Sequence, residues 1–181
     1  SWTRPKNLGF LVNSHDWEGQ PQLNSDGGKL FFSSDRPGGE GKRDIWLTER
    51  GTDGKWGIPK NLGKKINSSE DEQGPYYMDE RAILVFSTNQ KGGKGGLDFH
   101  QSLWDGKIWS ESVAIKEINS TSNDAGFSEG IHENQYYISR KVNDAIQDIQ
   151  IQSVEIPEFC WLKKPVDLPP PILVAKPAPI E

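Results

Sequence analysis

The sequence is poor in the residues that build disulfide frameworks and metal centres. Its 181 residues include one cysteine, one methionine and three histidines. Cys160 alone can form neither a disulfide within the chain nor a multi-cysteine metal site. The histidines, His15, His100 and His132, are not spaced as in a His-x-x-x-His metal motif. We therefore expect no resident metal and no other cofactor.

Long apolar runs and an excess of positive charge are also missing. No segment approaches the roughly 18 consecutive apolar residues of a membrane-spanning helix, so we expect a chain that does not span a membrane. Lysine and arginine number 21 against 26 acidic residues, a formal net charge of −5. The basic residues are scattered, whereas binding to nucleic acid needs a concentrated basic face. The composition therefore argues against a nucleic-acid partner.

What the sequence does contain is an internal repeat of about 53 residues. Trp2, Trp56 and Trp109 stand 54 and 53 residues apart, and each opens a similar segment. Residues 2–9 match residues 56–63 at six of eight positions. A missed repeat leads to the wrong fold, so this pattern is the first guide to the architecture.

Further anchors recur at equivalent places in the three copies. An asparagine followed by serine recurs at an equivalent place in each copy, and an acidic residue stands five positions later: Asn13, Asn67, Asn119 and Glu18, Glu72, Asp124. Residues 29–34 align with 83–88 and 135–140. A glycine-rich stretch then precedes an aspartate in the first two copies, whereas the third keeps the aspartate and loses the glycines: Asp44, Asp98, Asp148.

One repeat unit predicts four short antiparallel strands. Residues 24–28, Asn-Ser-Asp-Gly-Gly, indicate a tight turn between two extended runs. We expect strands at residues 20–24, 29–34, 43–48 and 56–62. Four strands per 50 residues are typical of a β-propeller blade, which needs neighbours to bury its faces.

The predicted fold class is therefore all-β, with three four-stranded propeller blades. The expected divisions are blade one at residues 1–55, blade two at 56–108, a degraded third blade at 109–156, and a proline-rich linker or tail at 157–181. Seven of the twelve prolines fall in that last segment, and proline does not continue a sheet ladder. We expect Cys160 and Trp161 to tuck against the last blade.

The repeat resembles the TolB/WD40-like propeller repeat found in OmpA-family envelope proteins of Bacteroidota, including members associated with type nine secretion. The residues that carry the resemblance are the Trp-x-x-Pro-Lys-Asn-Leu-Gly segment, the following Asn-Ser, and residues 25–36 with the later Gly-Gly-x-Gly. It covers about residues 1–155. The resemblance implies a propeller of six blades in the periplasm, as one module of an envelope protein.

Because propellers close with about four to eight blades, three repeats do not make a ring. We expect either a larger propeller to which this chain contributes, or a homodimer that completes a six-bladed ring. The expected function is a non-catalytic protein-interaction scaffold of the cell envelope, in the periplasm or associated with the outer membrane, whose partners are envelope proteins of the same complex. The alternatives are a propeller module that binds carbohydrate or peptidoglycan, and a fragment of a propeller hydrolase.

Three sets of residues are candidates for function or for turn structure. The acidic set could form an arc at the mouth of a central channel and face a cation or a basic loop, or its members could accept N–H bonds inside their own turns: Glu18, Glu72, Asp124. The second set is expected to fix turns: Asn13, Asn67, Asn119, Asp44, Asp98, Asp148. The third set, non-repeating tryptophans, suits sugar stacking, protein contacts or contacts between blades: Trp17, Trp46, Trp104.

Overall fold

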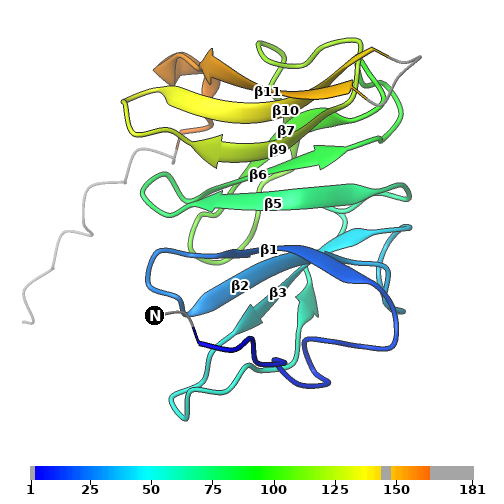
Figure 1. Cartoon of the computed structure of the whole chain (residues 1–181), viewed down its shortest axis with the longest axis vertical. Coiled ribbons are helices and arrows are strands. Elements are labelled where there is room, and N and C mark those ends of the chain that lie inside the picture. Colours follow the sequence, from blue (N-terminus) through cyan, green and yellow to red (C-terminus); the bar gives the residue numbers. More distant parts are fainter. Residues whose placement is uncertain (1–2, 144–147, 164–181) are drawn as a thin grey trace, which may run out of the picture.

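The computed structural model describes residues 3–143 and 148–163, and in these residues it is an all-β protein of three antiparallel sheets (Figure 1). Sheet 1 has the strand order β1-β2-β3-β4, sheet 2 has β5-β6-β7-β8, and sheet 3 has β9-β10-β11. The strands of sheet 1 are β1 Glu18–Leu23, β2 Lys29–Ser34, β3 Asp44–Glu49 and β4 Lys60–Asn61. Those of sheet 2 are β5 Glu72–Met78, β6 Ile83–Thr88, β7 Asp98–Leu103 and β8 Val113–Ala114. Sheet 3 contains β9 Asp124–Glu129, β10 Gln135–Asn143 and β11 Asp148–Glu155, and a short 3-10 helix follows at Glu158–Cys160.

The predicted turn between the first two strands is present. Gly27 has φ +70°, and its N–H donates to the carbonyl of Asn24 at 3.0 Å. The fourth strand is shorter than predicted. Trp56 makes only an isolated bridge to Arg50, and regular pairing with β3 is limited to β4.

The third repeat departs from the prediction of four strands, because sheet 3 has three strands among the described residues and β11 is its edge. Its register also differs from the sequence alignment. Ser33 opposes Ile45 and Ser87 opposes Phe99, but Ser139 opposes Ile151. The hairpin of β10 and β11 is thus longer, which places Asp148 opposite Asn143 rather than at the position equivalent to Asp44.

The apolar core lies mainly between successive sheets. We call the side of a sheet that faces the next sheet along the chain its forward face, and the opposite side its rear face. The forward face of sheet 1 packs against the rear face of sheet 2 in a cluster that includes Phe31, Ile45, Tyr77, Leu84 and Phe86. Each sheet is therefore stabilised by its neighbour, as expected of blades.

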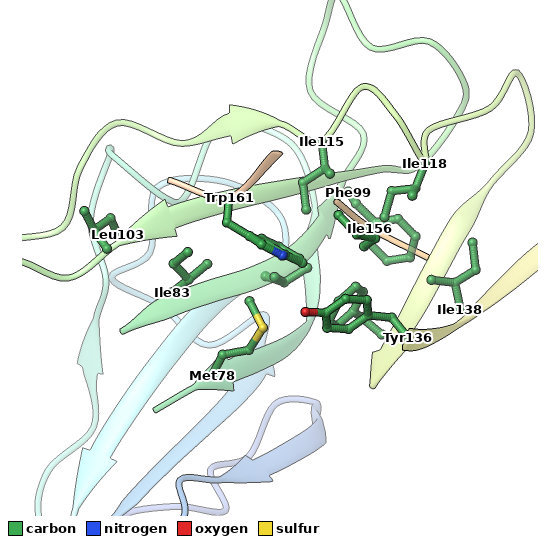
Figure 2. Close-up of a cluster of buried hydrophobic side chains, with 12 residues drawn as sticks. Met78, Ile83, Phe99, Leu103, Ile115, Ile118, Tyr136, Ile138, Ile156 and Trp161 are labelled. Atoms are coloured by element: carbon green, nitrogen blue, oxygen red, sulfur yellow. The ribbon is translucent and has the colours of Figure 1, made fainter. Parts of the chain in front are cut away.

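A second cluster fills the space between sheets 2 and 3 (Figure 2). Trp161, which follows the 3-10 helix, is buried there beside Phe127 and Tyr136, with ring centroids 6.2 and 5.2 Å away. The expectation that Trp161 tucks against the last blade is confirmed. The rest of the predicted tail, residues 164–181, lies outside the described residues. Over the described chain, no helix has the length and apolar character to cross a membrane.

Candidate functional site

The three predicted carboxylates stand at the first residues of β1, β5 and β9, and each is bonded within its own repeat. Each accepts the backbone N–H and the hydroxyl of the serine four residues earlier. Each also accepts a donor from the residue opposite it on the next strand: Glu18 from Ser34, Glu72 from Thr88, and Asp124 from Arg140. The carboxylates thus tie the connection between two sheets to the inner hairpin of the following sheet.

Burial makes these carboxylates poor candidates for contact with a ligand. Glu72 and Asp124 are both 0 % exposed, and Glu18 is largely buried beside the guanidinium of Arg36, which is 2.9 Å away. Burial raises the pKa of Glu72, and the three hydrogen bonds from Ser68 and Thr88 oppose that rise. No group of three histidine, cysteine or acidic side chains in the described ranges has the arrangement needed to hold a metal ion. The geometry favours the interpretation of these residues as supports of their turns.

The side-chain amides of two of the three predicted turn asparagines bond the backbone of the third strand of a sheet, as a neighbouring strand would. The side-chain oxygen of Asn67 accepts the N–H of Ile45 at 2.8 Å, and its amide nitrogen donates to the carbonyl of the same residue at 3.0 Å. Asn119 makes the same pair of bonds to Phe99, at 2.7 and 3.0 Å. In each case the connection that leaves a sheet is bonded back to the third strand of that sheet.

Asn13 lies in a segment of the same local shape as the one around Asn67. Its backbone N–H donates to Gly9, and its amide nitrogen donates to Asn7 at 3.0 Å. Asn67 makes the equivalent bonds to Gly63 and Asn61. No strand of the described residues stands beside Asn13 in the place that Ile45 holds beside Asn67.

The glycine-rich loops are closed by Asp44 and Asp98. Asp44 accepts the N–H groups of residues 40 and 41, and Asp98 accepts those of residues 94 and 95. A Cβ on Gly39 would lie 1.8 Å from a carboxylate oxygen of Asp44, so this position requires glycine. The close approach of backbone and carboxylate accounts for the glycines without a bound phosphate. For Asp148, the preceding residues 144–147 are outside the described residues.

The three predicted binding tryptophans lie in different environments and do not form one surface. Trp17 is 40 % exposed before β1, and the guanidinium of Arg43 lies 4.7 Å from its ring centroid. Trp46 is buried in β3 on the rear face of sheet 1, with Arg36 at 5.3 Å. Trp104 is half-buried after β7, and its ring centroid is 5.1 Å from that of Trp109.

Trp104 lines a groove between sheets 1 and 2 that is the strongest candidate binding surface. The groove has a volume of about 650 Å³. We call it the inter-sheet groove; its walls are formed by Phe31, Leu47, Leu62, Tyr77, Trp104 and Trp109, and its lip by Lys29, Glu49, Ile58 and Lys60. Ile58 at the lip is 75 % exposed. Concave apolar walls with a few polar groups at the edge are typical of binding sites.

The corresponding space between sheets 2 and 3 is crossed by the chain itself. Gln101 stands in β7 where Leu47 stands in β3. Its amide donates to the carbonyl of Cys160 at 2.7 Å and accepts the N–H of Leu162 at 3.0 Å. Leucine cannot make these bonds, and the described residues place no segment across the inter-sheet groove in this way.

Sequence reasoning found Trp104 but missed the other walls of the inter-sheet groove. Trp109 was used only as a marker of the repeat, Phe31 was treated as a strand residue, and Tyr77 was not singled out. The available signal was leucine at position 47 where the aligned second repeat has glutamine at position 101, and the strand registers confirm that the two residues hold the same place.

No protein-family model matches the chain, and no curated protein is detectably similar to it in sequence.

Proposed function

We propose that the chain is a non-catalytic interaction module of a bacterial cell envelope, and that it holds a protein partner in the inter-sheet groove. The observation that carries this proposal is the aromatic groove between sheets 1 and 2. This groove is open, whereas the corresponding space between sheets 2 and 3 is crossed by the chain itself. The envelope location, in the periplasm or at the outer membrane, comes from the resemblance of the repeat.

The side chains of the groove support a protein partner. Tryptophan and tyrosine dominate the binding energy of many interfaces, because their large rings bury much apolar surface at low entropic cost. Two lysines and one glutamate stand at the lip. We expect the partner to insert a large apolar side chain flanked by a carboxylate.

A glycan is the second candidate ligand, because Trp104, which packs on the buried Trp109, presents aromatic surface beside the polar side chains of Asn61 and Glu49. The wide separation of Trp17, Trp46 and Trp104 weakens the version of this idea in which all three stack on one sugar chain. The two kinds of ligand can be distinguished by the residues that their binding requires. Binding of a protein depends on Ile58 and the two lysines at the lip, whereas binding of a sugar depends on the tryptophan rings.

The test begins with photo-crosslinking in the native envelope. A photoreactive amino acid at position 58 is compared with one at Ile131, which is 92 % exposed and does not line the groove. The captured protein is then purified, and its dissociation constant is measured for the wild-type chain, for Ile58→Asp and for Ile131→Asp. We expect at least tenfold weaker binding for Ile58→Asp alone. Equal binding by both variants, or retention only on a glycan array, would refute the proposal of a protein partner.

A further inference from the structure

The two outermost faces of the three-sheet stack present apolar side chains at positions that are buried everywhere else in the fold. On the forward face of sheet 3, Ile151 is 78 % exposed. The residues in the same register of sheets 1 and 2, Ile45 and Phe99, are both 0 % exposed. The next sheet along the chain covers those two residues, whereas sheet 3 has no following sheet in the described chain.

Tyr137, on the neighbouring strand β10, is likewise more exposed than its counterparts in sheets 1 and 2. It is 38 % exposed, whereas its counterparts Phe31 and Val85 are 1 % and 0 % exposed. Ile149, two residues from Ile151 and therefore on the same face, is 63 % exposed. The forward face of sheet 3 thus has the apolar character of an internal sheet face and lacks the cover.

The rear face of sheet 1 carries one matching exposed residue, Leu23, beside Leu30, Phe32 and Trp46, which are already buried in a cluster with Val12. Leu23 opposes Leu30 as Tyr77 opposes Leu84, so Leu23 is the counterpart of Tyr77. Tyr77 stacks on Phe31 of the preceding sheet, with ring centroids 5.0 Å apart, whereas Leu23 is 50 % exposed.

The connection that precedes sheet 1 already has the local structure that the equivalent connection uses to bond the sheet before it. Asn13 already has the local bonds that Asn67 makes within its own turn. The amide of Asn67 goes on to bond both backbone groups of Ile45. Ile151 holds the register position of Ile45 at the free edge of β11, so its N–H and C=O point toward the side on which an asparagine amide would lie.

We propose that the forward face of sheet 3 binds the rear face of sheet 1 of a second copy of this chain. Tyr137 would then meet Leu23, and the Asn13 amide would bond the backbone of Ile151, in continuation of the interface that already joins sheets 1, 2 and 3. The two faces cannot meet within one chain, because sheet 1 and sheet 3 lie at opposite ends of the stack with sheet 2 between them (Figure 1).

The expected assembly is a dimer. Such a head-to-tail contact closes into a ring only if the rotation between sheets returns to the start. Propellers close with about four to eight blades, and six is the only multiple of three in that range. Two chains of three sheets satisfy it. This inference does not rest on the inter-sheet groove, which lies between sheets 1 and 2 and stays open in the dimer.

The native mass of the whole chain and of charged variants tests the proposal. We expect wild-type protein to have twice the 20.3 kDa mass of one chain, and Ile151→Lys to have the single-chain mass with an unchanged circular dichroism spectrum. The control Ile108→Lys adds the same charge at an exposed isoleucine between β7 and β8 of the middle sheet and should remain a dimer. A wild-type monomer at high micromolar concentration, or loss of the dimer in both variants, would overturn the proposal.

A mixed crosslinking experiment then identifies the faces. Chains that carry Leu23→Cys are mixed with chains that carry Tyr137→Cys, all in a Cys160→Ser background. We expect a disulfide between the two chains only in the mixture, and none when Ile108→Cys replaces Tyr137→Cys. A dimer that forms this disulfide no faster than the Ile108→Cys control would show that other surfaces join the copies, and would also overturn the proposal.

Discussion

The asparagines of the connections offer a perturbation whose size can be worked out from the structure. Asn67→Ala removes two hydrogen bonds to Ile45 and one to Asn61. The carbonyl of Ile45 still accepts the N–H of Leu62, but the N–H of Ile45 is left without a partner in a residue that is 0 % exposed. An orphaned buried donor costs about 1–3 kcal/mol, and each lost net hydrogen bond about 0.5–1.5 kcal/mol. We expect the free energy of unfolding to fall by roughly 2–4 kcal/mol.

The internal repeat supplies a matched control for this substitution. Asn13→Ala removes the same amide from a segment of the same shape, but among the described residues the side-chain bond lost is a single exposed one to Asn7. We expect a loss of about 0.5–1 kcal/mol for one net hydrogen bond, provided that stability is measured in dilute solution where the chain is a monomer.

Urea denaturation followed by tryptophan fluorescence measures both variants, and Asn119→Ala serves as a second case in which a buried N–H is orphaned. For a domain of this size, 2–4 kcal/mol corresponds to a fall in Tm of roughly 4–16 °C. Equal destabilisation by Asn67→Ala and Asn13→Ala would contradict this expectation, because the bonds to Ile45 would then contribute nothing.

Three further predictions concern the loops, the pH response and a buried ion pair. Gly39→Ala should lower the Tm by several degrees in a thermal melt, since its Cβ would collide with a carboxylate at 1.8 Å, whereas Gly57→Ala, with 3.3 Å to its nearest atom, should change it little. Burial lowers the pKa of His100, so its unfolded form binds a proton more readily; stability should fall as the pH drops below about 6.5, and His100→Gln should reduce that fall in urea titrations at pH 7.5 and 5.5. Arg140→Met leaves the fully buried carboxylate of Asp124 without its charged partner and should cost about 2–4 kcal/mol. The double variant with Asp124→Asn should recover part of that loss, and an unaltered stability of the single variant would contradict the role assigned to the pair.

Much of the architecture could be predicted from the sequence, because the repeat and the turn residues act locally. The Asn-Ser-Asp-Gly-Gly turn determines the hairpin of β1 and β2, since Gly27 takes a positive φ that other residues avoid. Strands one to three of the first repeat therefore lie close to their predicted bounds. The fourth strand was predicted too long, because proline at position 59 and the bridge at Trp56 leave only two residues in regular pairing.

Features that depend on contacts between repeats could not be predicted. The sequence alignment places Asp148 with Asp44, whereas the longer β10–β11 hairpin shifts the register by two residues and puts Ile151 opposite Ser139. The inter-sheet groove likewise depends on two strands 54 residues apart, in which Leu47 and Gln101 hold the same position. Neither residue is unusual for a strand. The local sequence therefore does not indicate that the space between sheets 1 and 2 is open while the space between sheets 2 and 3 is filled.

The most direct test of the proposed binding surface changes one side chain in the wall of the inter-sheet groove. Leu47→Gln installs in sheet 1 the residue that sheet 2 has at the same position, and it places a polar amide in the apolar wall of the groove. Calorimetric titration of the captured envelope partner should give a dissociation constant at least tenfold weaker for this variant than for the wild-type chain, while both chains unfold at similar urea concentrations. An unchanged dissociation constant would show that the partner binds elsewhere and would contradict the proposed function of the inter-sheet groove.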